Sequence, residues 1–451
     1  MAIIDTSTPS DTLAPLVGRT LSLRDARYPA TETDFEFDVA IVGLGYVGLP
    51  TALAYHAAGS RVLGIDVSTS RLDHIRAGAV DLIARDHARL DEALDQDGFE
   101  ITSDASQIAR AEAVIVCVPT PVDRYLVPDL TMLRSACEAV VEHAVPGQLL
   151  MLTSTTFVGC TAEMLLNPVT RRGMVPGRDI FVAFSAERID PGQETIVQEA
   201  VPRVVGGATD ACVDRAAAVL GAYAPDVHRV TSLGTAEMTK LLENTFRAVN
   251  IALINEFADI CRTLDLDVTD VIAAASTKPY GYMPFTPGAG VGGHCIPCDP
   301  HYLLWQLRKE RVEAPMISEA MQQIANRPTQ VVQRIRALLS DRGRSLAGAR
   351  ILVVGVAYKP DVADLRESPA LEIMQRLRGF GASIGYVDPH VPRLVLDGQE
   401  MEPVKDPATF APTLVLLHTS HRDASLDWLR PDQLVLDATY RGTGIANRVA
   451  L

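Results

Sequence analysis

The sequence predicts an α/β protein with two doubly wound, Rossmann-like domains joined by a long central helix. Residues 37–68 contain an apolar strand, a glycine turn, a helix rich in small residues and a second strand, which together make one βαβ unit. A second strand, turn and helix begins at Arg350, and a continuous helical pattern runs from Thr235 to about Leu266. Alternating strands and helices of this kind form parallel sheets that are covered on both faces.

Length and pattern divide the chain into four parts. At 451 residues the chain exceeds what one core usually holds, so two or three domains are expected. We expect a flexible extension, rich in Ser, Thr, Pro and Asp, over residues 1–34. It is followed by a first α/β domain over 35–233, a helical region over 234–328 and a second α/β domain over 329–451.

Composition limits the classes of partner. The chain has 41 Lys and Arg against 56 Asp and Glu, a formal net charge of −15, which disfavours nucleic acids and acidic membranes as partners. No apolar run reaches the ~18 residues of a membrane span, and the N-terminus lacks a secretory signal pattern, so we expect a cytoplasmic protein. The seven cysteines are odd in number and widely spread, so reduced thiols are expected.

The first glycine turn predicts a dinucleotide site. Gly43, Gly45 and Gly48, with Tyr46 and Val47 among them, follow a strand and open a helix. Asp66 ends the next strand at about the 20-residue spacing of the dinucleotide fingerprint. The glycines allow close approach to a pyrophosphate at a helix N-terminus, and an aspartate can accept from a ribose 2′-hydroxyl. The pattern therefore predicts NAD rather than NADP. The strands in AVIVCVPT, LLMLTST and IFVAFS extend the same sheet.

The central helix is unusually long. At about 1.5 Å per residue it would span roughly 45 Å, which is typical of a helix that bridges domains or subunits. Apolar residues recur along it at helical spacing: Met238, Leu241, Leu242, Phe246, Val249, Leu253, Phe257 and Ile260.

Two polar residues of this helix are candidates for chemistry. Lys240 and Asn244 lie one turn apart and share a face. The spacing alone fits a solvated polar stripe, whereas the apolar neighbours of Asn244 favour a functional pair. On the second interpretation, Glu237 and Glu243 supply the exposed face instead.

The unit that begins at Arg350 resembles a degenerate repeat of the first. It has Gly355 but lacks the second and third turn glycines, and its second strand ends at Asp388 as the first unit's ends at Asp66. Ser368 and Pro369 are expected as the N-cap and first-turn residue of its helix. We therefore expect this unit to hold something other than a dinucleotide pyrophosphate.

The stretch GVGGHCIPCDP, residues 290–300, contains two cysteines three apart. A structural zinc site needs about four ligands, and no second pair has suitable spacing, so no metal is expected. A redox pair would follow the first strand of a βαβ unit, whereas this one follows a glycine loop. The third interpretation is a single nucleophile, Cys295. Asp299 and Pro300 are expected as N-cap and first-turn residue of the next helix, which would favour a thiolate at Cys295.

Taken together, these segments resemble the nucleotide-sugar 6-dehydrogenase family, which oxidises a UDP-hexose to the uronic acid. The resemblance covers residues 37–445, and FSAERIDPG, KLLENTFRAVN and GGHCIP are more similar to the UDP-N-acetylhexosamine branch than to the UDP-glucose branch. Its most specific segments are VGLGYVGLP, VPTP, STT, AERIDPG, AEMTKLLENTFRAVNIALINE, TPGAGVGGHCIPCDP and GVAYKPDVADLRESP.

The resemblance implies a two-step, four-electron reaction. The C6 hydroxymethyl group gives a hydride to NAD, a cysteine holds the aldehyde as a thiohemiacetal, a second NAD takes another hydride, and water cleaves the thioester. It implies that Cys295 is the nucleophile and Cys298 a bystander. Lys240 and Asn244 would stabilise the oxyanion, and Asp299 would tune proton transfer. Thr155 and Glu187 would lie near the reacting carbon.

The same resemblance implies the remaining site residues. Lys359 would contact substrate and Arg366 would lie near the cofactor, both brought from the C-terminal, nucleotide-sugar-binding domain. Arg188 and Arg247 are either substrate contacts or surface arginines. The implied cofactor site comprises Gly43, Gly45, Tyr46, Val47, Gly48, Asp66, Arg71, Pro119, Thr120, Thr155 and Arg366. The implied substrate site comprises Glu187, Arg188, Lys240, Asn244, Arg247, Phe285, Gly292 and Lys359.

Three positions depart from the family pattern. Ala186 replaces a proline, and Thr153 stands where the branch often has an acidic residue. Pro191 replaces a glutamate that the UDP-glucose branch uses in thioester hydrolysis, so the hydrolytic base is open.

Other functions stay open at this point. UDP-glucose or TDP-glucose could replace a UDP-N-acetylhexosamine as the substrate of the same chemistry. A non-catalytic binder of NAD or nucleotide sugar, and a disulfide oxidoreductase using CIPC, are the alternatives from other classes. The long helix is expected to form the core of a homodimer, as the resemblance also implies.

Overall fold

The computed structural model describes residues 34–188, 198–224, 226–293 and 295–451. The predicted extension lies almost wholly outside these residues, and so does Pro191. Among the described helices, none is both long enough and apolar enough to cross a membrane. All seven cysteines are free, as the sequence predicted.

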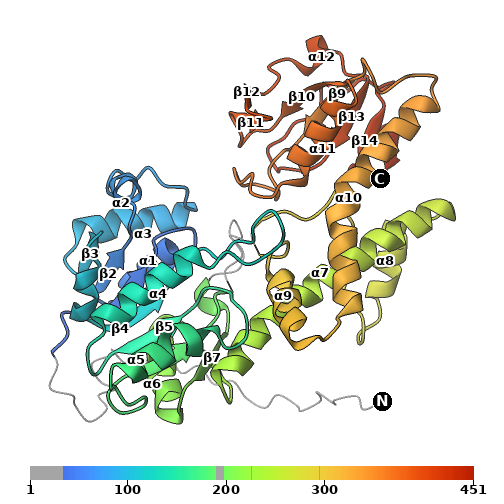
Figure 1. Ribbon diagram of the computed structural model, residues 1–451. Coiled ribbons are helices and arrows are strands. Elements are labelled where there is room, and N and C mark those ends of the chain that lie inside the picture. Colours follow the sequence, from blue (N-terminus) through green and yellow to red (C-terminus); the bar gives the residue numbers. More distant parts are fainter. Residues whose placement is uncertain (1–33, 189–197, 225, 294) are drawn as a thin grey trace.

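The first sheet has eight strands in the order β3-β2-β1-β4-β5-β6-β7-β8 (Figure 1). Strands β1–β6 are parallel, whereas β7 runs antiparallel to β6 and β8 runs parallel to β7, so the sheet is mixed at one side rather than uniformly parallel. The strands are β1 Phe37–Val42, β2 Val62–Ile65, β3 Phe99–Thr102, β4 Ala111–Val116, β5 Leu149–Leu152, β6 Phe181–Phe184, β7 Arg203–Gly207 and β8 Val227–Arg229.

Helices cover both faces of this sheet, as expected for apolar strands that are buried on two sides. Helices α1 (Gly48–Ala57), α2 (Thr69–Arg76), α3 (Ala84–Asp95) and α6 (Asp210–Leu220) pack on one face. Helices α4 (Thr131–His143) and α5 (Asn167–Arg171) pack on the other, with the π-helical turn η2 (Ala162–Leu166). Two short 3₁₀ segments, η1 (Ala105–Arg110) and η3 (Gln198–Ala200), lie in connections.

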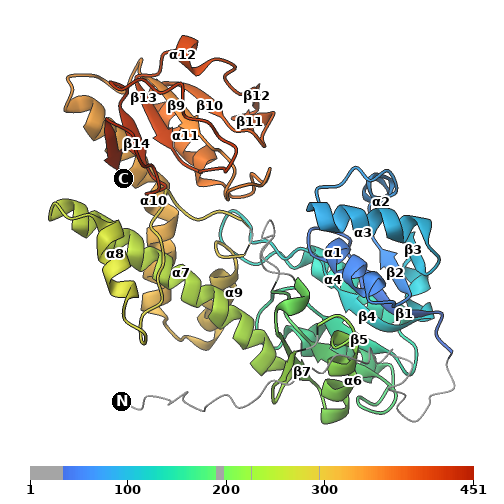
Figure 2. The same ribbon diagram turned by 180° about the vertical axis from the view of Figure 1, so that it is seen from behind.

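The central region is built on α7, which spans Leu233–Thr263, 31 residues. Figures 1 and 2 show α7 running from the first sheet to α8 (Val268–Ser276). Helix α9 (Asp299–Glu310) packs against α7, and α10 (Pro315–Ser340) crosses α7 and continues into the C-terminal lobe.

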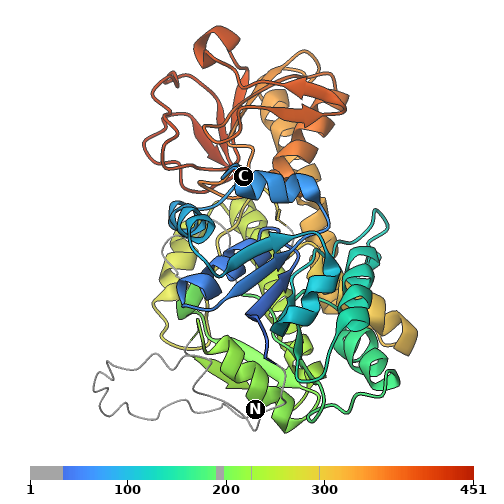
Figure 3. The same cartoon turned by 90° about the vertical axis from the view of Figure 1, so that its left-hand side faces the viewer.

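The C-terminal lobe contains a five-stranded parallel sheet in the order β10-β9-β13-β14-β15, and it lies above the first lobe in the side view of Figure 3. Helices α10 and α11 (Pro369–Gly379) pack on one face of the sheet, and loops cover the other. The fold class predicted from the sequence is therefore confirmed. The remaining elements are β9 Arg350–Val354, β10 Ser383–Val387, β11 Leu394–Leu396, β12 Gln399–Met401, α12 Pro407–Phe410, β13 Leu414–Leu417, β14 Val435–Asp437 and β15 Arg448–Ala450.

Candidate active site

The glycine turn after β1 is shaped for a phosphate group. Gly43 has φ +93, and a Cβ atom there would lie 2.7 Å from the Cys117 carbonyl oxygen. A Cβ atom on Gly48 would lie 1.8 Å from the Gly43 carbonyl oxygen, whereas one on Gly45 would point into open space. The first and third glycines therefore allow the tight turn and the close packing of the helix, and the second leaves room for a ligand.

The start of α1 is open to an anion. No side chain caps this helix, and the helix dipole favours negative charge at its N-terminus. Asp66 lies beside the turn, where its Oδ2 accepts from Leu44 N at 2.9 Å and its Oδ1 accepts from Ser68 N at 2.9 Å. The residues present fit an NAD molecule.

The other predicted cofactor residues surround this turn. Arg71 Nε donates to the Leu44 carbonyl at 2.9 Å, and Thr120 is buried next to the exposed Pro119. The Arg366 guanidinium of the C-terminal lobe stacks on the Tyr46 ring at 4.3 Å. Val47 is the N-terminal flanking residue of α1. Arg366, which follows Tyr46 by 320 positions in the sequence, thus reaches the cofactor turn.

We expect Asp66 to make NAD strongly preferred. An NADP 2′-phosphate would meet the carboxylate where NAD has a hydroxyl, and such a like-charge contact lowers kcat/KM for NADP by about 100-fold or more. Steady-state rates with both cofactors test this. Asp66→Ser should bring kcat/KM for NADP closer to that for NAD. Asp73→Ser, which removes an exposed carboxylate on α2, should leave the ratio of the two kcat/KM values unchanged. Comparable kcat/KM values in the wild type would show that Asp66 does not contact the ribose.

Helix α7 turns a polar face inward. Lys240 is 9% exposed, Asn244 3% and Glu237 1%, so Lys240 and Asn244 do not form a solvated stripe. The expectation that Glu237 is exposed is wrong. Its carboxylate accepts from Gly159 N at 2.6 Å and from Thr161 N and Oγ1 at 2.8 and 2.7 Å.

Glu237 joins two parts of the candidate site. It fixes the start of α7, one turn before Lys240, to Gly159 and Thr161 in the segment that follows Thr155. Burial raises the pKa of Glu237, and the three donors oppose that shift.

Asp299 lies at the centre of the buried polar group. The prediction that it caps α9 is wrong, because Cys298 is the N-cap residue and Asp299 is the first residue of the helix. Its side chain is turned inward, where it accepts from Asn244 Nδ2 and from Thr155. Burial raises its pKa to about 6, against the opposing effects of Lys240, Asn244 and Thr155. A carboxyl group with this pKa can exchange a proton near neutral pH.

Cys295 lies one turn before α9, and its carbonyl oxygen accepts from Asp299 N at 2.8 Å. The residue is exposed, whereas Cys298 is buried. The expectation of a favoured thiolate is wrong. Surrounding protein and the nearby Asp299 raise the pKa of Cys295, although Lys240, Arg247 and Arg366 lower it in part. The resting group is therefore a thiol, and attack on a carbonyl needs a nearby proton acceptor.

The backbone and the side chain of Glu187 contact different residues of the candidate site. Its backbone carbonyl accepts from Lys240 Nζ at 2.9 Å, and its carboxylate pairs with Arg203, which is 1% exposed. Arg188 pairs with Glu243 of α7 and donates to the Pro202 carbonyl at 2.8 Å. The structure therefore places Glu187 next to Lys240 through its backbone, with its carboxylate held by a buried arginine.

The glycine loop before Cys295 packs on the C-terminal lobe. A Cβ atom on Gly292 would lie 2.5 Å from Tyr358 Cβ, and one on Gly293 would lie 2.9 Å from the Tyr358 ring. Gly293 N also donates to the Arg366 carbonyl at 3.0 Å. Lys359, next to Tyr358, is therefore brought to the loop that carries Cys295.

Arg247 and Phe285 lie on the central region. Arg247 is exposed on α7 and close enough to Cys295 to lower its thiol pKa. Phe285 packs edge-on against Phe246, with ring centroids 6.1 Å apart.

Three family models match the chain in sequence order. All describe the UDP-glucose/GDP-mannose dehydrogenase family: its NAD binding domain matches residues 37–224, its central domain residues 234–326 and its UDP binding domain residues 352–439. A UDP-N-acetyl-D-mannosamine dehydrogenase of Campylobacter jejuni is 35% identical over 81% of this chain and 90% of its own length. The chain belongs to the UDP-glucose/GDP-mannose dehydrogenase family.

Two further proteins that match this chain are also dehydrogenases of UDP-N-acetylhexosamines. A UDP-N-acetyl-D-glucosamine 6-dehydrogenase of Pseudomonas aeruginosa is 32% identical over 79% of this chain and 83% of its own length. The solved UDP-D-ManNAc dehydrogenase of Pyrococcus horikoshii superposes with a TM-score of 0.83 at 29% identity, covering 92% of this chain and 98% of its own. The protein is an NAD-dependent nucleotide-sugar dehydrogenase.

Two residues of this dehydrogenase were missed from the sequence. Glu237 was assigned to the exposed face because α7 has many apolar residues and an acid among them usually faces water. Arg203 was not considered, because an arginine at the start of a strand gives no signal of burial. The motif AEMTKLLEN places Glu237 three residues before Lys240 on the same side of the helix, and that spacing could have revealed it.

A cavity of about 970 Å³ lies beside the loop that carries Cys295, where Val291, Pro297 and Cys298 line it. Its other walls come from the loop with Arg124, from α9 and α10, and from the start of α11 and β11 in the C-terminal lobe.

Proposed function

We propose that this dehydrogenase oxidises the C6 hydroxymethyl group of a UDP-N-acetylhexosamine to the carboxylate, with two NAD reduced per sugar. The observation that carries the proposal is the exposed Cys295 beside a buried group of Lys240, Asn244 and Asp299, at the meeting of the NAD turn and the C-terminal lobe. The N-acetylhexosamine branch is supported by the relatives named above. UDP-glucose and TDP-glucose are less favoured alternatives.

In the first oxidation the hydroxyl proton needs an acceptor. NAD, when bound, supplies the hydride acceptor. Asp299 has a pKa of about 6 and is ionised at neutral pH, so it can receive a proton through the Thr155 hydroxyl or a water molecule. Lys240 and Asn244 donate toward the oxygen on which negative charge develops, in a site where burial strengthens each contact.

Cys295 holds the aldehyde between the two oxidations. Its thiol gives up a proton and adds to the carbonyl carbon, which forms a thiohemiacetal. A second hydride leaves that carbon to give a thioester, and water then cleaves the carbon–sulfur bond to release the acid and regenerate the thiol. With proline at position 191, we propose Asp299 as the acceptor of the proton from this water, because the Glu187 carboxylate is paired with Arg203.

The nucleotide part of the substrate lies on the C-terminal side in this proposal. Lys359 offers a cation to the diphosphate, and Arg247 and Phe285 line the central side. Gly292 lets the loop pack closely on Tyr358, since a side chain there would clash with Tyr358. This close packing leaves room for the sugar. Arg188, which pairs with Glu243, acts mainly in positioning the Glu187 segment.

A substrate panel tests this function. UDP-N-acetylmannosamine, UDP-N-acetylglucosamine, UDP-glucose and TDP-glucose are each incubated with NAD, and NADH formation is followed. We expect the highest kcat/KM for one of the two N-acetylated sugars. Higher kcat/KM for a sugar with a free 2-hydroxyl would overturn the substrate class, and no turnover of any of them would overturn the reaction.

We also propose a homodimer through α7. Large apolar side chains on the outer side of this helix are 41–65% exposed in the single chain, and at 100° per residue they fall in one stripe about 100° wide. They are Met238, Leu242, Phe246, Leu253, Phe257 and Ile260. A second copy would cover such a stripe in an isologous contact.

The seven free cysteines fit a reducing compartment, and we propose the cytoplasm.

Phe257→Asp should dissociate this dimer. The phenylalanine is 44% exposed in one chain, and an unpaired charge buried at the centre of an apolar contact opposes association. Sedimentation at micromolar concentration should give twice the 48.6 kDa chain mass for the wild type and the chain mass for the variant. Val175→Asp, a similarly exposed residue of the first lobe (43%), should remain dimeric. A wild type at the chain mass would refute the dimer.

A further inference from the structure

The C-terminal unit repeats the geometry of the NAD turn. Gly355 has φ +75, like Gly43 in the first unit. Asp388 follows β10 as Asp66 follows β2, and its Oδ2 accepts from Val356 N at 2.7 Å, the equivalent of the contact between Asp66 and Leu44. A Cβ atom on Gly355 would lie 2.0 Å from the Thr419 carbonyl oxygen. The Thr419 carbonyl thus packs on Gly355 as the Cys117 carbonyl packs on Gly43.

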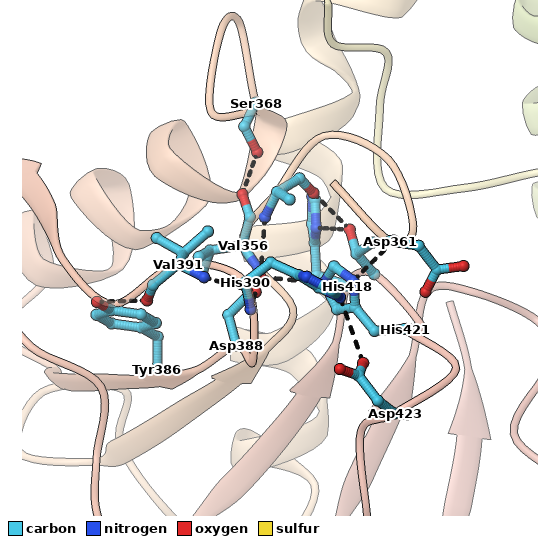
Figure 4. A network of polar contacts seen from close by, with 12 residues as sticks. Val356, Asp361, Ser368, Tyr386, Asp388, His390, Val391, His418, His421 and Asp423 are labelled. Atoms are coloured by element: carbon cyan, nitrogen blue, oxygen red, sulfur yellow. Dashed lines mark hydrogen bonds and ion pairs between the residues drawn. The ribbon is translucent and has the colours of Figure 1, made fainter. Parts of the chain in front are cut away.

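Asp388 has no capacity left for a ribose. Its side chain is fully buried, and Ala357 N and His421 Nε2 also reach its Oδ2, at 3.1 Å each. Its Oδ1 accepts from His390 N and Val391 N. These donors hold the pKa of Asp388 at about 2 despite burial, so it is ionised at neutral pH. The network is drawn in Figure 4.

His421 connects this buried carboxylate to the substrate loop, residues 356–366. Its Nδ1 accepts from Asp361 N at 2.9 Å, and its Nε2 therefore carries the proton that goes to Asp388. Asp361, His390 and His421 approach within 4.8 Å, a spacing that a metal ion could use. Here, however, both nitrogens of His421 have protein partners, and the Asp361 carboxylate accepts from Arg422 N and Nε.

The contact with His421 bears on the conformation of the substrate loop. Asp361 has φ +60, a conformation that a residue with a side chain adopts only when its surroundings hold it. Two residues earlier lies Lys359, and on its other side Tyr358 packs on Gly292 and Gly293. Lys359 therefore lies between the Tyr358 contact and Asp361, whose amide is held by His421 and whose carboxylate is held by Arg422.

We propose that His421 is a positioning residue for the nucleotide sugar, acting through Asp361 on Lys359. The proposal rests on the function proposed above, in which Lys359 contacts the substrate diphosphate. An ordered loop spares the substrate the entropy of fixing the lysine, so loss of the anchor weakens ground-state and transition-state binding alike.

Two substitutions of His421 separate its two hydrogen bonds. In asparagine the amide atoms are bonded to Cγ, as Nδ1 is, so His421→Asn keeps an acceptor for Asp361 N and loses the donor to Asp388. In glutamine the amide atoms stand one bond further out, as Nε2 does, so His421→Gln keeps the donor and loses the acceptor. Each variant removes one buried hydrogen bond, and only His421→Gln removes the one that holds the Asp361 amide.

We expect His421→Gln to raise KM for the nucleotide sugar by about fivefold to tenfold with kcat within about twofold, as expected for a lost hydrogen bond that affects binding alone. His421→Asn should keep KM within about twofold of the wild type, although both variants should melt at lower temperature. Equal KM values in the two variants, or a larger rise in His421→Asn, would overturn the proposal.

Amide hydrogen exchange gives a readout that does not depend on turnover. The Asp361 amide should be protected in the wild type and in His421→Asn, and exchange faster in His421→Gln. Rapid exchange in the wild type would overturn the anchor even if no variant folded. A wild type that turns over no nucleotide sugar would refute the proposed function, and the exchange measurement would still test the anchor.

Discussion

Cys295→Ser should lower kcat for the oxidation that reduces two NAD per sugar by about 10³-fold or more. A serine hydroxyl is a far weaker nucleophile at neutral pH than a cysteine. The side chain is exposed at the cleft, so the change disturbs no core, and NAD binding should persist. Titration of NAD by fluorescence and NADH formation at saturating substrate measure the two properties separately. Retained turnover would exclude the covalent route through Cys295.

Cys298→Val is the matched control for this experiment. Cys298 is buried, and burial raises its pKa to about 12, so its thiol is inert and a valine can fill its place. We expect activity within a few-fold of the wild type. In the wild type the ratio of NADH to sugar acid should be two, without free aldehyde, and a ratio near one would contradict the four-electron reaction. Inactivation of Cys298→Val would restore the paired-cysteine mechanism.

Asp299→Asn should lower kcat by about 100-fold or more, the usual contribution of a positioned proton acceptor. The amide keeps the shape of the side chain and can still accept from Asn244, but it cannot take a proton. In the wild type kcat should fall as pH decreases through about 6, where Asp299 becomes protonated. Asp86→Asn, which removes another buried carboxylate that pairs with Arg85 and Arg89, should retain activity. Wild-type kcat in Asp299→Asn would assign the proton transfer elsewhere.

The same substitution should change how stability depends on pH. The folded-state pKa of Asp299 is about 6 against an ordinary 3.8, so the folded state binds the proton more tightly than the unfolded state. The free energy of unfolding therefore falls as pH rises from about 4 to about 6, by up to about 3 kcal/mol from this group. Relative to the wild type, Asp299→Asn should gain stability over that window. An equal difference in the free energy of unfolding between Asp299→Asn and the wild type at pH 4 and at pH 7.5 would show that burial does not disfavour the ionised carboxyl.

The sequence predicted the two sheets and the cofactor turn because their signals are local. A strand, three glycines and an acidic residue at fixed spacing have few other physical uses. The shared face of Lys240 and Asn244 follows from helix geometry alone. Cys295 could be named from its loop, and its exposure beside the buried Cys298 agrees with that assignment.

The errors concern groups whose environment is made by distant segments. Asp299 precedes a proline at a helix start, which is a capping pattern, yet Asn244 and Thr155 draw its carboxylate inward from elsewhere in the chain. The thiolate expected for Cys295 was argued from a helix end, whereas the surrounding protein and that same carboxylate raise the pKa of its thiol. Glu237 and Arg203 are buried charges whose partners lie 76 and 16 positions away, and no local pattern reports such pairs.

The contacts of Arg366 give the two sides of the cleft different strengths. On one side its carbonyl holds Gly293, and the glycine loop is packed against Tyr358. On the other side its guanidinium, which pairs with Asp364 of the same lobe, stacks on Tyr46, a contact worth about 0.5–1 kcal/mol at an exposed site. A reaction that reduces two NAD for each sugar must replace the cofactor midway, while the half-oxidised sugar stays bonded to the enzyme. Because the stack is the weaker of the two contacts, the cofactor side would open more readily than the sugar side, which favours retention of the reactive intermediate through the interval between the two oxidations.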